Sequence, residues 1–166
     1  KYFSGNDCIY TIAPDFETLQ YEGGESTQKI DDSDNNIQKY GEEYHLEGVS
    51  QATKDIYTKI KSIAGEIDKA LIFNPQKYYI SIKAGKNIAF IKIRINKVRF
   101  IAMMPEDDIR SLVKHHNVAV LSMPVQDFYN GPCAAVDIVK NEHMHEIDAL
   151  MRRMVAYHKS GSSSTE

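Results

Sequence analysis

The stretch that most constrains the fold is residues 77–107, KYYISIKAGKNIAFIKIRINKVRFIAMMPED. It holds three apolar runs rich in β-branched and aromatic residues, and such runs favour strands. The runs are separated by AGKN and INKV. With Gly85–Lys86 and Asn96–Lys97 as two-residue turns, the stretch is predicted to fold as a three-stranded antiparallel meander.

Strand alternation gives this ribbon two faces of different character. One face is apolar throughout and is predicted to be buried; it comprises Ile80, Ile82, Ala89, Ile91, Ile93, Ile95, Val98, Phe100 and Ala102. The other face is mixed, basic at the Asn96–Lys97 end and apolar at the opposite end. It comprises Tyr79, Ser81, Lys83, Ile88, Phe90, Lys92, Arg94, Arg99, Ile101 and Met103.

Helical periodicity and capping residues predict about three helices to cover the sheet, near residues 50–68, 106–116 and 142–158. Ser50 and Asn141 are the expected N-caps of the first and last helices. CAAVDIV is predicted as a strand, and NVAVLSM as a strand or an extended segment. The fold class expected from these elements is α+β: an antiparallel β-meander sheet packed with helices, plus an N-terminal β-hairpin.

The chain is expected to divide into four parts. Residues 1–22 are predicted to form a β-hairpin that ends a preceding domain. Residues 23–45, rich in Gly, Ser, Asp and Asn, are predicted to be an acidic linker, because they hold few apolar residues. The α+β domain is expected over 46–158, followed by a disordered tail over 159–166. Since the first residue is Lys, the chain is expected to be part of a longer polypeptide.

Charge and cysteine usage narrow the class of protein. The 166 residues carry a formal net charge of −3, which argues against nucleic-acid binding by bulk electrostatics. Residues 77–99 nevertheless contain seven Lys and Arg and no acid. The two cysteines, Cys8 and Cys133, are far apart and are predicted to be reduced thiols of a cytoplasmic protein. No apolar run approaches the roughly 18 residues of a membrane helix, so no membrane association is expected.

We find no pattern that predicts catalysis, a metal or a cofactor. EHMHE at 142–146 lacks the spacing of two histidines four residues apart on a helix, and a solvated helix start accounts for it. Neither cysteine lies in a nucleophile signature, and no serine lies in a Gly-x-Ser-x-Gly elbow. GKNIAF lacks the frame of a phosphate-binding loop. The chain is therefore predicted not to be an enzyme.

The basic part of the mixed face is the best candidate site. Cationic and aromatic side chains on one sheet face can neutralise phosphates and stack on bases. The candidate nucleic-acid or anion-binding residues are Tyr79, Lys83, Phe90, Lys92, Arg94 and Arg99. The simpler interpretation is a sheet face partly covered by a helix, with Lys and Arg stems packed and their charged ends in water.

KYYISIKAGKN carries a family resemblance. Lys77, Tyr79, Ile80, Lys83 and Asn87 fit a Lys-x-Tyr-Ile-x-x-Lys-x-x-x-Asn pattern. The pattern resembles that of an uncharacterised C-terminal domain family, sometimes labelled "predicted transport protein". Members of that family follow restriction-endonuclease-like nuclease domains of the PD-(D/E)xK type. The layout of hairpin, linker, helix, meander, turn, strand and closing helix is similar as well, although VQDFYNG lacks the Trp expected before the turn.

The resemblance implies a nuclease context, but no nuclease site lies in this chain. A PD-(D/E)xK site needs an acid two residues before a Lys, and no Lys here has one. The predicted function is therefore a non-catalytic accessory domain of a nuclease-type protein that contacts nucleic acid through the basic ribbon. The alternative is a protein-interaction or homodimerisation module that uses the mixed face or the Met-rich closing helix. A third interpretation is a small-molecule pocket near Tyr79, Phe128 and Tyr129.

Overall fold

The computed structural model describes residues 40–161, which belong to the compact unit Asp34–Glu166. Within them it contains a six-stranded antiparallel sheet and five helices, so the α+β class is confirmed. The strands are β1 (Ile72–Pro75), β2 (Ile80–Ala84), β3 (Lys86–Arg94), β4 (Lys97–Ala102), β5 (Asn117–Val120) and β6 (Ala134–Ile138). The helices are α3 (Glu42–Leu46), α4 (Gln51–Ile67), α5 (Glu106–Leu112), α6 (Met123–Phe128) and α7 (Met144–Ser160).

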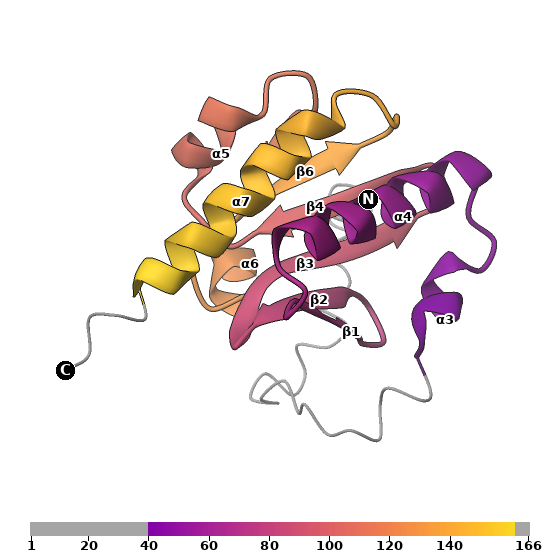
Figure 1. The fold of residues 1–166 in the computed structure, drawn as a ribbon, viewed down its shortest axis with the longest axis horizontal. Coiled ribbons are helices and arrows are strands. Elements are labelled where there is room, and N and C mark those ends of the chain that lie inside the picture. Colours follow the sequence, from indigo (N-terminus) through magenta and orange to yellow (C-terminus); the bar gives the residue numbers. More distant parts are fainter. Residues whose placement is uncertain (1–39, 162–166) are drawn as a thin grey trace, which may run out of the picture. The chain divides into compact units, whose positions relative to one another are not determined.

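The strands follow the order β1-β2-β3-β4-β6-β5, with every pair antiparallel (Figure 1). β2, β3 and β4 are successive neighbours, so the meander predicted for this stretch is confirmed. The predicted turn Gly85–Lys86 is wrong, because Lys86 already pairs with Ala84 and only Gly85 links the two strands. β6 enters the sheet between β4 and β5, and all five of its residues are buried. A strand that is buried on both faces is apolar nearly throughout, which is how CAAVDIV reads.

Helices α4 and α7 pack side by side across one face of the sheet and form the main core with it (Figure 1). Ile56, Ile60 and Ile63 of α4 meet the sheet residues Ile91 and Phe100 in one apolar cluster. Ser50 is the N-cap of α4 as expected, and its hydroxyl accepts a hydrogen bond from the Thr53 N–H at 3.3 Å. The periodicity that predicted this helix therefore reflects ordinary packing onto the sheet.

The turn between β3 and β4 lies one residue earlier than predicted. Arg94 pairs with Lys97, so the two-residue turn is Ile95–Asn96 rather than Asn96–Lys97. Ile95, predicted to be buried, is 66 % exposed because it lies in this turn. Its carbonyl instead accepts bonds from the Ser50 N–H at 2.9 Å and the Thr53 hydroxyl at 3.1 Å. The turn thus anchors the start of α4 through its backbone.

The prediction that Ile88 lies on the mixed face is wrong, because β3 contains a β-bulge at this residue. Ile82 pairs with Ala89 and Lys83 pairs with Asn87, which leaves Ile88 as an extra residue on β3. A bulge interrupts the alternation of side chains between the two faces. Ile88 therefore joins the main core, fully buried, instead of lying on the mixed face.

Several element boundaries also differ from the predictions. The sequence predicted about three helices, and the described residues contain two more, α3 and α6. Helix α3 occupies the end of the predicted linker, where Glu42 and Glu43 favour a helix start. Helix α7 begins after His143 rather than Asn141 and continues to Ser160, into the predicted tail. There Lys159 forms an ion pair with Asp68 at 3.0 Å. The predicted hairpin over 1–22 lies outside the described residues.

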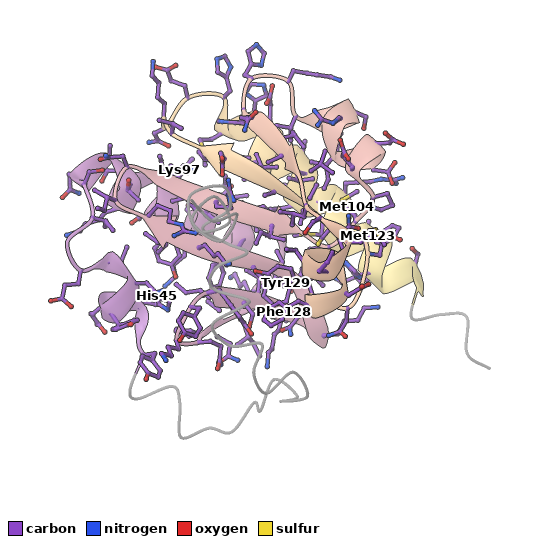
Figure 2. All side chains as sticks on the ribbon, turned by 180° about the vertical axis from the view of Figure 1, so that it is seen from behind. His45, Lys97, Met104, Met123, Phe128 and Tyr129 are labelled. Carbon is purple, nitrogen blue, oxygen red and sulfur yellow. The ribbon has the colours of Figure 1, made fainter. Side chains whose placement is uncertain are left out.

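Helix α6 covers part of the opposite face of the sheet (Figure 2). Beneath it, Phe90, Ile101 and Ala135 of the sheet are buried, as are Val125 of α6 and Tyr129 just after it. The α6 C-terminus is a Schellman turn: the Gly131 N–H donates to the Gln126 carbonyl at 3.1 Å, and the Asn130 N–H to the Asp127 carbonyl at 3.0 Å. Asn130 takes the left-handed conformation at φ 64° that this turn requires.

Candidate nucleic-acid interface

The basic side chains of the mixed face come together at one end of the sheet. Across β3 and β4, Lys92 lies directly opposite Arg99 and Arg94 lies directly opposite Lys97. We call these four residues the basic end. Lys97 is a member that the sequence prediction assigned to the turn. Lys83 is the exception among the predicted cations: it lies on β2 and pairs with Asn87 near the start of β3, at the opposite end of that strand from Arg94, so it does not belong to the basic end.

One carboxylate, Asp137 of β6, lies beside the basic end. It is Arg99's register partner and accepts from the Arg99 guanidinium at 2.8 Å (Nε) and 3.0 Å (Nη2). It also accepts from Lys97 Nζ at 2.9 Å. Burial alone would raise the pKa of Asp137, but the hydrogen bonds from Arg99 and Lys97 outweigh it and hold the pKa below its ordinary value. Asp137 is therefore an ionised anchor that fixes two cations in place.

Exposure differs among the residues of the basic end. Lys92 is buried at 8 % exposure, whereas the side chains of Arg99 and Lys97 are 20 % and 36 % exposed. Arg94 is also partly exposed. Figure 2 shows Lys97 at an end of the sheet away from α6. A large ligand can therefore reach Arg94, Lys97 and Arg99, while Lys92 would act on it only through the local electrostatic potential.

The two aromatic candidates, Tyr79 and Phe90, are not arranged for stacking on bases. They are 8 % and 1 % exposed, and their rings meet edge to face with centroids 5.1 Å apart. The ring of Tyr129 lies 4.6 Å from that of Phe90 and 6.4 Å from that of Tyr79. Base stacking needs an accessible ring face, so we assign these residues to the packing beneath α6.

The same cluster bears on the predicted small-molecule pocket near Tyr79, Phe128 and Tyr129. The Phe128 ring lies edge to face on Tyr129 at 5.1 Å, and Tyr129 is only 4 % exposed. The rings of Tyr79, Phe90 and Tyr129 are buried against one another, so they leave little space for a ligand. A ligand there would have to displace the α6 packing.

The surfaces named for the homodimer alternative are also largely internal. Met144, Met151 and Met154 of α7 are each 7 % exposed or less and belong to the main core. On the mixed face, Ile101 and Met103 are buried as well. These methionines therefore serve packing, and dimerisation remains a prediction.

Cys133 is not suited to nucleophilic chemistry. Its side chain is 2 % exposed, and burial raises its pKa to about 11. A thiol in that environment stays protonated and inert at neutral pH.

A polar cluster that the sequence prediction missed joins α7 to the segment after α5. Glu146 is 5 % exposed and accepts bonds from the backbone N–H groups of Lys114 and His115 at 3.0 and 3.1 Å. The His115 ring contacts the same carboxylate at 2.5 Å and stacks on the His143 ring at 3.9 Å. In residues 40–161 no group of three His, Cys, Asp or Glu is placed to hold a metal ion.

Glu146 thus has a structural role that EHMHE did not reveal. Burial would raise the pKa of its carboxyl, but the bonds from His115 and Lys114 together lower it to about 2. The only sign of this role in the sequence was that Glu146 stands at a position where the helical period of α7 predicts a buried residue.

Protein-family models, curated proteins and solved structures were all compared with this chain, and none of them matches it. None of the helices between residues 40 and 161 has the length and apolar character needed to cross a membrane.

Proposed function

We propose that this domain is a non-catalytic accessory domain that contacts the phosphate backbone of nucleic acid through the basic end. The observation that carries the proposal is the pairing of like charges, Lys92 opposite Arg99 and Arg94 opposite Lys97. Like charges directly opposite each other destabilise a sheet. Asp137 offsets part of this repulsion by binding Arg99 and Lys97. Four cations grouped on adjacent positions of β3 and β4 still give the local positive potential that attracts a polyanion.

The type of contact follows from the burial of the aromatic residues. With Tyr79 and Phe90 packed under α6, the partly exposed groups are the guanidinium and ammonium ends of Arg94, Lys97 and Arg99. These groups recognise phosphates and carry no base information by themselves. The proposed binding is therefore electrostatic, independent of sequence and dependent on salt. The nuclease context that the resemblance implies belongs to the same proposal: this domain would hold the substrate and perform no chemistry.

The test is a gel-shift titration of the full chain with a short DNA duplex and the matching single strand. Arg94→Glu/Lys97→Glu reverses two partly exposed cations and leaves buried Lys92 in place. We expect it to weaken binding at least about tenfold, and wild-type affinity to fall with a log–log salt slope of roughly −2 to −3, as for two or three phosphate contacts.

The matched control is Lys59→Glu/Arg153→Glu. It makes the same change of charge at exposed positions on α4 and α7, which cover the opposite face of the sheet. We expect the control to bind nearly as well as wild type. Absence of binding at about 50 mM salt, or an equal loss in both variants, would contradict the proposal, since bulk charge and not this surface would then decide binding.

A further inference from the structure

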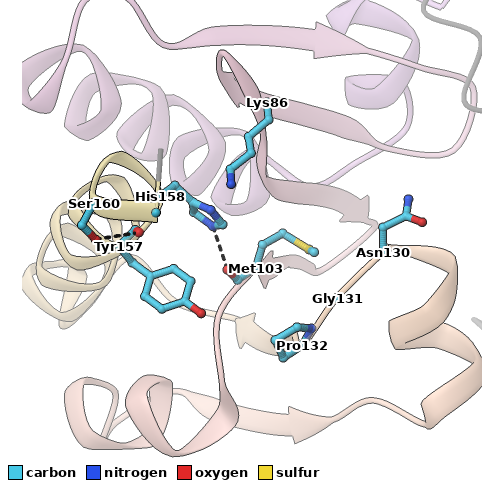
Figure 3. Close-up of a pocket in the computed structure, with 9 residues that line it drawn as sticks. Lys86, Met103, Asn130, Gly131, Pro132, Tyr157, His158 and Ser160 are labelled. Carbon is cyan, nitrogen blue, oxygen red and sulfur yellow. Dashed lines mark hydrogen bonds between the residues drawn. The ribbon is translucent and has the colours of Figure 1, made fainter. Parts of the chain in front are cut away.

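A second, separate surface feature is an open pocket of about 430 Å³ at the C-terminal end of α7 (Figure 3). It lies between that helix end, the start of β3 and the loop from α6 to β6. Its size falls in the range of small-molecule sites. The lining residues are Lys86, Met103, Asn130, Gly131, Pro132, Tyr157, His158, Ser160 and Gly161.

The polar groups of this pocket are mainly hydrogen-bond donors. Lys86 brings an ammonium group, Tyr157 a hydroxyl and Asn130 an amide, and no Asp or Glu is among the lining residues. Figure 3 shows Lys86 extending toward His158, and the Tyr157 hydroxyl directed toward Pro132. Met103 and Pro132 add an apolar wall. A positive group and neutral donors beside an apolar wall suit a small organic anion.

The lining is held in place by the fold. His158 Nε2 donates to the Met103 carbonyl at 2.7 Å, which fixes the imidazole across the pocket. The Schellman turn at the end of α6 fixes the backbone of Asn130 and Gly131. A ligand therefore meets an imidazole and a stretch of backbone whose positions are set before it binds, which lowers the entropic cost of binding.

The end of α7 opposes an anion to a limited extent, because a helix C-terminus carries partial negative charge. Here two of the last carbonyls, those of Tyr157 and Lys159, already accept hydrogen bonds. The Gly161 N–H is shared between the carbonyls of Tyr157 and Lys159, and the Ser160 hydroxyl donates to the Tyr157 carbonyl at 3.0 Å. Carbonyls that already accept bonds repel an incoming anion less, so the positive charge of Lys86 meets weaker opposition from the helix end.

We infer that this pocket binds a small organic oxyanion, a phosphate monoester or a carboxylate, with its charged group at Lys86 and Tyr157 and its apolar part against Met103 and Pro132. The site is separate from the basic end. Lys86 and Arg94 are the first and last residues of β3, and eight residue steps along a strand span about 26 Å. The inference therefore holds or fails independently of nucleic-acid binding.

The test is an amide NMR titration of the ¹⁵N-labelled full chain with phenyl phosphate, inorganic phosphate and phenylacetate. We expect saturable shifts at the amides of Lys86, Gly131 and Gly161 with phenyl phosphate or phenylacetate, and weaker ones with inorganic phosphate, which lacks an apolar part. Lys86→Gln is expected to weaken binding about tenfold, because it removes the positive charge. Tyr157→Phe is expected to weaken binding about threefold, because it removes one neutral donor to a charged group. Lys59→Gln, on the exposed side of α4, is the matched control.

Three results would overturn the inference. One is the absence of saturable shifts at the pocket amides with any of the three probes. Another is equal weakening by Lys86→Gln and Lys59→Gln, which would reflect net charge only. A third is saturation at the Arg94 and Lys97 amides alone, which would place the anion at the basic end. The amide spectrum of each variant also reports directly whether it is folded.

Discussion

At the scale of single residues, Glu146 is the clearest link between chemistry and stability. A carboxyl whose pKa is lowered on folding stabilises the fold fully above its unfolded pKa, and the contribution is lost as the pH falls through the folded value. For Glu146 that window runs from 4.5 down to about 2. At about 1.4 kcal/mol per pH unit, the contribution is roughly 3.5 kcal/mol at most.

We therefore expect Glu146→Gln to lower the free energy of unfolding by roughly 2–3 kcal/mol at pH 7. The difference from wild type should narrow as the pH falls below 4.5, because the wild-type carboxyl then becomes protonated. Urea unfolding, followed down to the lowest pH at which both proteins fold, measures this. Glu142→Gln, at an exposed neighbouring position, should show no such trend. A difference that is constant with pH would mean that the charge of Glu146 is not what stabilises the fold.

At the scale of elements, the position of the β3–β4 turn gives the sharpest prediction. Ile95 lies in the turn and is 66 % exposed, whereas Ile91, four residues earlier in β3, is fully buried. Ile95→Asn should change stability by less than about 0.5 kcal/mol. Ile91→Asn should cost roughly 3–5 kcal/mol, because it leaves a cavity and buries an amide. Thermal unfolding measures the loss of stability in each variant. A comparable loss at both positions would mean that Ile95 is buried, as it would be if the turn were Asn96–Lys97.

The elements also show how far sequence patterns reach. The meander and α4 could be predicted because hydrophobic period and capping are local signals, and both are strong here. Local patterns could not predict the turn at Ile95–Asn96 or the bulge at Ile88, because backbone hydrogen bonding between strands decides where each of them lies. Alternation through INKV placed Ile95 inside, while its carbonyl is what α4 actually contacts.

The candidate site was predictable in part for the same reason. Its cations lie on consecutive strands, so alternation placed Lys92, Arg94 and Arg99 on one face. Asp137 comes from β6, about 40 residues later along the chain, and only the insertion of β6 beside β4 brings it there. An acid in the apolar run CAAVDIV indicated a buried, paired carboxylate, but no nearby residue in the sequence identified the cations that it binds. The burial of Tyr79 and Phe90 likewise depends on α6, which the sequence analysis did not predict.

At the scale of the whole molecule, the net charge of −3 and the basic end have opposite effects on a polyanion. Screening at physiological salt acts over about 8 Å, so local charge outweighs the total once a ligand is in contact. Asp137 is the residue where folding and binding conflict. It fixes Arg99 and Lys97, and it also subtracts a charge from the surface that would meet phosphate.

Asp137→Asn should therefore change the two properties in opposite directions. Loss of a buried carboxylate that forms ion pairs with two cations should lower the free energy of unfolding by roughly 2–4 kcal/mol. In the fraction that remains folded, removal of one negative charge should raise affinity for duplex DNA roughly twofold to fivefold at low salt. Urea unfolding and gel-shift titration on the same preparation measure both. If stability falls but affinity falls with it, Asp137 acts by positioning the cations, and its charge matters less to binding than the geometry it imposes on Arg99 and Lys97.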